Sequence, residues 1–237
     1  MESRSATPDR ERTIVEPTQR VRVKICCISS RAEAKLAVEH GASALGLVSA
    51  MPSGAGIIDE PLIAEIAPTI PPGVASFLLT SQPTAEAIID QQRRLRVNTL
   101  QLVDALPLGT LERLRETLPG VSLVQVIHVC DEDAIDEAIA ASQVADAILL
   151  DSGNPRLTVK ELGGTGRLHD WSISRRIRES IDKPIYLAGG LNAENVGEAI
   201  AAVRPWGVDV CSGVRTNGRL DAVKLQRFFE AVNSASV

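Results

Sequence analysis

The chain has 237 residues, of which 44% are hydrophobic, and its 30 acidic and 25 basic residues give a formal net charge of −5. Aromatic residues make up only 3% and there is no basic excess, so nucleic acid is not indicated and we expect a small-molecule partner. No apolar run approaches the roughly 20 residues that a membrane-spanning helix needs, so no membrane partner is expected either.

The first 20 residues differ in composition from the rest of the chain. Residues 1–20 contain four acidic and four basic residues and lack the apolar core of a signal peptide. We therefore expect a disordered leader over residues 1–20 and one folded domain over residues 21–237.

From residue 21 onward, short apolar runs alternate with amphipathic segments, which is typical of parallel strands joined by crossover helices. The expected strands are 21–26, 43–48, 74–79, 99–103, 122–129, 145–151, 184–189 and 207–212. Helices are expected at 32–41, ending in a glycine suited to a left-handed cap, and at 192–203, opening with Asn192 as the cap. Eight such units predict an α/β protein with a single (β/α)8 barrel (TIM barrel), whose active site lies at the carboxyl ends of the strands.

Three kinds of chemistry stand at those strand ends. Cys26 ends the first strand, Asp151 ends the sixth, and glycine-containing turns follow the seventh (Gly189-Gly190) and the eighth (Ser212-Gly213). Backbone N–H groups of the last two turns predict a phosphate site, because barrels commonly bind phosphate there. The alternative is that these glycines serve only the turns or close packing.

The four cysteines, at positions 26, 27, 130 and 211, lack the paired CxxC or Cys/His spacing of a zinc site. They indicate neither a disulfide framework nor a bound metal, and predict a cytoplasmic protein in a reducing compartment.

Several segments together resemble the phosphoribosylanthranilate isomerase family, within the ribulose-phosphate-binding barrel superfamily. They are VKIC (23–26), ILLD (148–151), GGTGRLHDW (163–171) and LAGGLNAENVGEAIAAVRPWGVDVCSGV (187–214). The resemblance implies an Amadori-type rearrangement of N-(5-phosphoribosyl)anthranilate in tryptophan biosynthesis, without a cofactor or metal, by a monomer or homodimer. It also implies Cys26 as the catalytic base and Asp151 as the catalytic acid. The implied phosphate ligands are Gly164, Gly189, Gly190, Ser212 and Gly213.

The chemistry of the reaction supports such a pair. Opening the ribose ring needs a proton on the ring oxygen, and the next step removes a proton from C2, so an acid and a base must flank the sugar. Reference pKa values of roughly 8.5 for a thiol and 3.9 for a carboxyl require the site to lower the first and raise the second. Alternatively, Cys26 is only a small buried hydrophobe.

Three neighbouring residues have candidate roles. Lys24 shares a strand face with Cys26, so it is expected to help lower the pKa of the thiol and to face the substrate. Asp209 is either a substrate contact or the partner of Lys24, since buried charges pair. Cys27, on the opposite strand face, is expected to point away from the barrel and to pack.

Four positions depart from the family pattern. Gly56 stands where the family has the arginine that meets the anthranilate carboxylate, Val103 and Asp104 replace His-Gly, Gln125 replaces a lysine, and Cys27 replaces a glycine. These changes concentrate on the half of the site that holds the aromatic acid.

Arg156, Lys160 and Arg215 are candidates for a compensating cation, although each is more commonly a solvated surface charge. Three readings follow: an isomerase of the family substrate, a barrel isomerase of a different aminosugar phosphate, or a non-catalytic phosphate-binding descendant. The fold alone does not decide among them.

Overall fold

The computed structural model describes residues 20–154, 156–158, 160–162 and 168–235. The expected disordered leader, apart from Arg20, and the expected phosphate ligand Gly164 lie outside the described residues. Arg20 donates a hydrogen bond of 3.0 Å from its guanidinium to the side-chain oxygen of Asn233.

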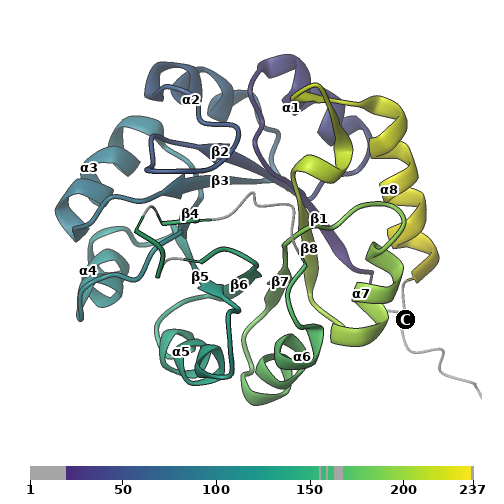
Figure 1. Cartoon of the computed structure of the whole chain (residues 1–237). Coiled ribbons are helices and arrows are strands. Elements are labelled where there is room, and N and C mark those ends of the chain that lie inside the picture. The colour runs from purple at the N-terminus through teal and green to yellow at the C-terminus, as the bar shows by residue number, and fades with distance from the viewer. Residues whose placement is uncertain (1–19, 155, 159, 163–167, 236–237) are drawn as a thin grey trace, which may run out of the picture.

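Eight parallel strands pair in sequence order and close on themselves, β8 against β1, into one barrel (Figure 1). The strands are β1 (Arg22–Ile25), β2 (Ala44–Val48), β3 (Ala75–Thr80), β4 (Thr99–Leu102), β5 (Ser122–His128), β6 (Ala147–Asp151), β7 (Ile185–Leu187) and β8 (Gly207–Val210). Each lies within one residue of its expected range or inside it, so the expected (β/α)8 barrel is confirmed.

Helices follow the strands and form the outer ring (Figure 1). They are α1 (Arg31–Glu39), α2 (Glu60–Ile66), α3 (Ala85–Leu95), α4 (Thr110–Thr117), α5 (Asp133–Ser142), α6 (Trp171–Ser180), α7 (Val196–Val203) and α8 (Ala222–Ala235). Short additions are the 3-10 turns η1 (Ala67–Thr69) and η2 (Ser212–Val214) and the hairpin β9 (Arg215–Thr216) to β10 (Arg219–Leu220). None of the helices among the described residues is both long and apolar enough to cross a membrane.

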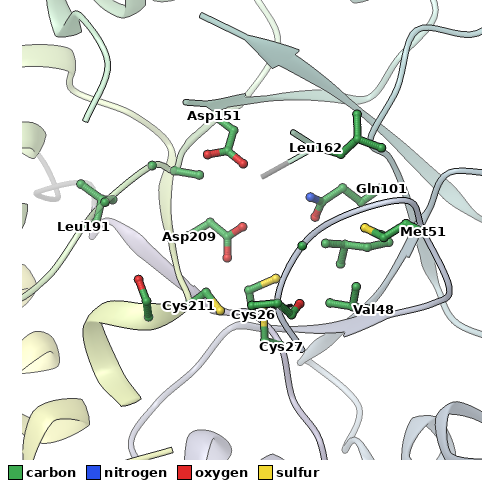
Figure 2. A pocket seen from close by; sticks show the side chains of 17 residues that line it. Cys26, Cys27, Val48, Met51, Gln101, Asp151, Leu162, Leu191, Asp209 and Cys211 are labelled. Carbon is green, nitrogen blue, oxygen red and sulfur yellow. Dashed lines mark hydrogen bonds between the residues drawn. The ribbon is translucent and has the colours of Figure 1, made fainter. Parts of the chain in front are cut away.

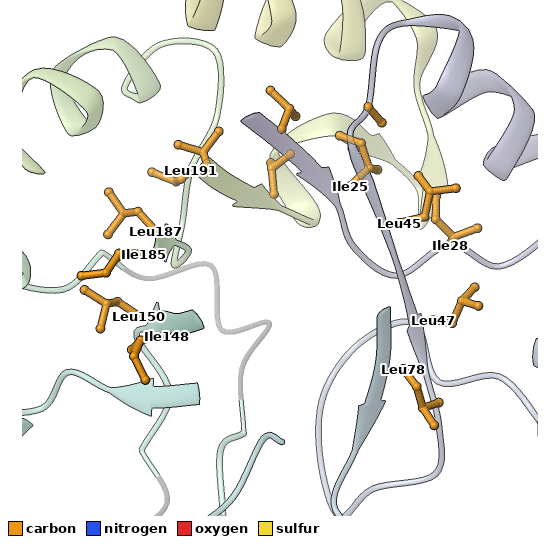
Figure 3. Packing of buried hydrophobic residues seen from close by; sticks show 14 of the residues in the cluster. Ile25, Ile28, Leu45, Leu47, Leu78, Ile148, Leu150, Ile185, Leu187 and Leu191 are labelled. Carbon is orange, nitrogen blue, oxygen red and sulfur yellow. The ribbon is translucent and has the colours of Figure 1, made fainter. Parts of the chain in front are cut away.

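Two separate apolar clusters stabilise the barrel, because strand side chains alternate between its two faces. The larger cluster fills the space between strands and helices and includes Ile25, Leu45 and Leu78 (Figure 3). The smaller cluster fills the inside of the barrel, where the rings of Phe77 and Tyr186 meet edge to face with centroids 5.8 Å apart. The inside of the barrel is therefore a packed core that supports whatever side chains lie at its mouth.

The two helix ends expected from the sequence differ in outcome. Gly41 has φ +98°, so the expected left-handed turn after α1 is confirmed. The expectation that Asn192 opens a helix at 192 is wrong, because α7 begins at Val196. The Asn192 side chain instead accepts hydrogen bonds from the backbone N–H groups of Glu194 and Asn195 and so shapes the turn that precedes α7.

Candidate active site

A pocket lies at the carboxyl end of the barrel, and side chains from several strands point into it (Figure 2). It brings together most of the site residues expected from the sequence, namely Cys26, Asp151, Gly189, Gly190, Asp209 and Ser212. Its other walls are mainly apolar: Val48, Met51, Ala55, Leu79, Leu162, Ala188 and Leu191. The strand ends therefore converge on one cavity, as the barrel topology predicts.

Cys26 sits just beyond β1, where its backbone N–H still donates to the carbonyl oxygen of Val210 on β8. Its side chain lies in the inner cluster and is 6% exposed. The Cys26 side chain lies against Gly46 of β2, which has no side chain. A Cβ built on Gly46 would lie 2.8 Å from the Cys26 Sγ and 3.1 Å from the Lys24 Nζ. The absence of a side chain at Gly46 therefore lets the thiol and the ammonium approach each other.

Lys24 is fully buried and donates to the Asp209 carboxylate over 2.7 Å. Burial alone would lower the pKa of Lys24, but the Asp209 carboxylate and the neighbouring Cys26 and Cys27 together raise it, so the ammonium stays charged. Burial raises the pKa of Asp209, and Lys24 offsets part of that rise. The second oxygen of Asp209 is buried without a hydrogen-bond partner among the described residues, and Asp209 lines the pocket. The two expected roles of Asp209 are thus compatible, whereas Lys24 lies beneath the pocket lining and acts on the site through Asp209 and the neighbouring thiol.

Lys24→Met is expected to lower the free energy of unfolding by about 3–5 kcal/mol, because it leaves the Asp209 carboxylate buried without a counter-charge. Urea unfolding measures this loss. The loss should shrink as the pH falls: without Lys24 the folded-state pKa of Asp209 is raised further, and a carboxyl with a raised pKa stabilises the fold when protonated. Lys35→Met is the matched control, because Lys35 is 76% exposed and should change stability by less than about 1 kcal/mol. An equally small loss for Lys24→Met would contradict the structural role of the pair.

Asp151 ends β6 and projects into the pocket opposite β1 (Figure 2). One of its carboxylate oxygens accepts a 2.7 Å hydrogen bond from the backbone N–H of Ser152, which orients the group. Cys26 and Asp151 therefore face the same cavity from β1 and β6, with Asp209 of β8 between those strands in the closed barrel.

The turns after β7 and β8 form one rim of the pocket. Gly189 and Gly190 have φ of +86° and +62°, a conformation that glycine adopts without strain, and Ser212 begins the short turn η2. Gly213 lies behind this rim, and a Cβ there would overlap the carbonyl oxygen of Leu191. The two turns are therefore packed directly against each other, and Gly213 is required for that contact even though it does not line the pocket.

Residues 23–231 match the family model described as N-(5'phosphoribosyl)anthranilate (PRA) isomerase. The chain belongs to this family. A PRA isomerase of Methanocella arvoryzae is 38% identical over 208 residues, which cover 88% of this chain and 95% of that protein. The crystal structure of the PRA isomerase from Thermotoga maritima superposes with a TM-score of 0.78 at 31% identity, covering 90% of this chain and 99% of that one. A PRA isomerase in complex with reduced 1-(o-carboxyphenylamino)-1-deoxyribulose 5-phosphate gives a TM-score of 0.75 at 29% identity, with the same coverage.

Cys27 departs from the PRA isomerase pattern. Our expectation that Cys27 packs outside the barrel is wrong. β1 ends at Ile25, and Cys27 takes a left-handed φ of +63° that interrupts the strand alternation. Its side chain turns into the inner cluster and lines the pocket, while Ile28 returns to the outer cluster. The positive φ explains the family's glycine at this position, since glycine adopts it without strain.

None of the three candidate compensating cations faces the pocket. Arg156 pairs with Asp131 and Lys160 pairs with Asp104, both on partly exposed surface. Arg215 is 8% exposed, pairs with Glu33 and also donates to the backbone carbonyl oxygens of Cys26 and Cys27. Arg215 thus holds the segment that carries the two cysteines in place, and no described cation stands in for the family arginine at Gly56.

The other two departures have different structural consequences. Val103 packs in the inner cluster and is almost fully buried, so an apolar group replaces the family histidine there. Gln125 alternates with the inward-facing Val124 and Val126, so it lies on the helix side, where its amide donates to the carbonyl oxygens of Leu102 and Asp104. Of these two changes, only the one at Val103 affects the inside of the barrel directly.

Two residues that we did not select from the sequence belong to this region. Gln101 lines the pocket from β4, and its side-chain oxygen is buried without a partner among the described residues. The imidazole of His169 bonds to the hydroxyl of Ser174 over 2.7 Å and lies against Gly189. Burial lowers the pKa of His169, although the Asp151 carboxylate opposes this effect. Strand alternation would have placed Gln101 inside, whereas only the fold brings His169 to the rim.

The described residues hold no group of three His, Cys, Asp or Glu side chains suited to a metal ion. No disulfide joins any of the four cysteines in the described part of the chain.

Proposed function

We propose that this chain catalyses the Amadori rearrangement of N-(5-phosphoribosyl)anthranilate to 1-(o-carboxyphenylamino)-1-deoxyribulose 5-phosphate, without a cofactor. The observation that carries the proposal is the placement of Cys26 and Asp151 around one pocket whose rim is formed by the turns after β7 and β8. The ligand of the related complex is the reduced form of the proposed product and carries the same carboxyphenylamino group.

The reaction needs one proton donor and one proton acceptor on the sugar. Asp151, in its protonated form, donates to the ring oxygen as the C1–O bond breaks, which gives a protonated imine. The Cys26 thiolate then removes the proton from C2, and the resulting enolamine tautomerises to the ketose. The ammonium of Lys24 lies close to this thiol, across the bare backbone of Gly46.

The phosphate is proposed to bind at the rim formed by the turns after β7 and β8. Backbone N–H groups of Gly189, Gly190 and Ser212 are the expected donors, and Gly213 allows the two turns to approach. Lys24 is not proposed as a direct substrate contact, because it is fully buried. Asp209, with its unpartnered oxygen at the pocket, is proposed to accept a hydrogen bond from a sugar hydroxyl.

The missing family arginine at Gly56 favours a second candidate, an isomerase of a different aminosugar phosphate. Without a counter-charge, the anthranilate carboxylate would lose about 2–5 kcal/mol of binding free energy where it is desolvated. A cytoplasmic location is proposed with either function, and four cysteines without a disulfide among the described residues support it.

Complementation of a tryptophan auxotroph that lacks PRA isomerase tests the proposed function. We expect growth without tryptophan. We expect the purified protein to convert N-(5-phosphoribosyl)anthranilate at a low rate, because Gly56 stands where the family has an arginine for the anthranilate carboxylate. The assay follows the fluorescence of the anthranilate group. Failure of both growth and turnover, with a folded protein, would contradict activity on this substrate.

A further inference from the structure

Two of the departures from the family pattern touch each other. A Cβ atom built on Gly56 would overlap the Cβ of Cys27 and lie 2.9 Å from its Sγ. The thiol also donates a hydrogen bond of 3.5 Å to the carbonyl oxygen of Ala55, next to Gly56. The side chain of Cys27 therefore occupies the space that any side chain at position 56 would need.

This exclusion concerns the Cβ atom of Cys27 more than its sulfur. Cβ atoms in proteins do not approach each other this closely, so backbone of one or both loops would have to move to admit a residue at position 56. A glycine at position 27 would remove the Cβ and Sγ from this space and suits the local φ of +63°. A Cβ at position 56 would still lie 3.0 Å from the Cα of residue 27, and Gly56 itself has a left-handed φ of +73°. The side chain of Cys27 and any side chain at position 56 thus compete for the same volume.

The pocket around this contact disfavours a negative charge. Its described lining includes the carboxyl groups of Asp151 and Asp209 and no Lys or Arg side chain that could pair with a substrate carboxylate. A hydrogen bond with Cys211, a second with Cys26 and burial all raise the pKa of Cys27, so its thiol stays protonated and neutral. The apolar residues Val48, Met51 and Leu79 belong to the same cluster as Cys27 and line the pocket with it, and Gln101 adds an uncharged amide.

We propose that Cys27 determines the specificity of this site, so that the non-sugar half of the substrate is recognised by apolar contact and not by an ion pair. The inference rests on the proposed aminosugar isomerase function and specifies its substrate class. An N-(5-phosphoribosyl)amine with an uncharged aryl group binds at least as well as the anthranilate compound, because no carboxylate has to lose its water against unpaired walls.

Two reduced product analogues test this preference by binding alone. One carries the o-carboxyphenylamino group and the other carries phenylamino, both on the same reduced sugar phosphate, and calorimetry gives each dissociation constant. We expect the phenylamino analogue to bind as tightly or more tightly. Tighter binding of the carboxylated analogue by more than threefold would overturn the proposal. Because neither measurement needs turnover, loss of the proposed function and loss of this inference give different results.

A pair of double variants tests the role of Cys27 itself. In Cys27→Gly/Gly56→Arg the Cβ and Sγ of residue 27 are removed, and we expect the carboxylated analogue to bind at least tenfold more tightly than to the wild type. In Cys27→Ala/Gly56→Arg the Cβ persists, so we expect no such gain. Equal gains in both double variants would show that Cys27 does not exclude the arginine. Circular dichroism checks that each variant is folded. If a variant does not fold, the comparison of the two analogues on the wild-type protein still tests the proposal.

Discussion

Cys26→Ser is expected to retain the fold while losing about 10²–10⁴-fold in kcat on whichever phosphoribosylamine the wild type converts. Serine has nearly the same shape but a far less acidic hydroxyl, so the change removes the base more than it changes packing in the inner cluster. Steady-state kinetics measures kcat and KM separately, and KM should change little because the phosphate rim is untouched.

Cys130→Ser is the matched control for this experiment. Cys130 is exposed, and its thiol bonds to the carbonyl oxygen of Gly153 outside the pocket. The same atom exchange there should leave kcat unaltered. If Cys26→Ser keeps kcat within about threefold of the wild type, far below the range expected for a general base, then Cys26 is only a packing residue.

Asp151→Asn is expected to cause a loss of similar size, about 10²–10⁴-fold in kcat, because an amide cannot deliver the proton that opens the ribose ring. The amide oxygen of asparagine can still accept the hydrogen bond from Ser152, so the orientation of the side chain should persist. Binding of inorganic phosphate, measured by calorimetry, should remain within a few-fold of the wild type.

Asp136→Asn provides the corresponding control, since Asp136 is exposed on α5 and does not line the pocket. An Asp151→Asn variant with normal kcat would show that another group supplies the proton. A variant that loses kcat and phosphate binding together would instead indicate that Asp151 shapes the rim.

The alternation of apolar strands and amphipathic helices determined the fold from the sequence alone. Period-two and helical patterns are local properties, and eight repeats in a chain of this length leave few arrangements other than a barrel. Because all eight strands run parallel, their carboxyl ends meet at one mouth, and this rule placed Cys26, Asp151 and the turns after β7 and β8 around one pocket. The position of Gly164 stays a prediction, because it lies outside the described residues.

Only the tertiary structure decided which of these side chains touch. Lys24 and Asp209 are partners because β1 and β8 close the barrel with those two residues in register, a pairing between strands 185 positions apart in the sequence. The direction of Cys27 depends on one left-handed backbone angle at the end of β1, which strand alternation does not predict. Its exclusion of a side chain at Gly56 then depends on a loop after β2 folding back over that turn. Such contacts depend on packing between segments that are distant in the sequence, so the local sequence pattern does not predict them.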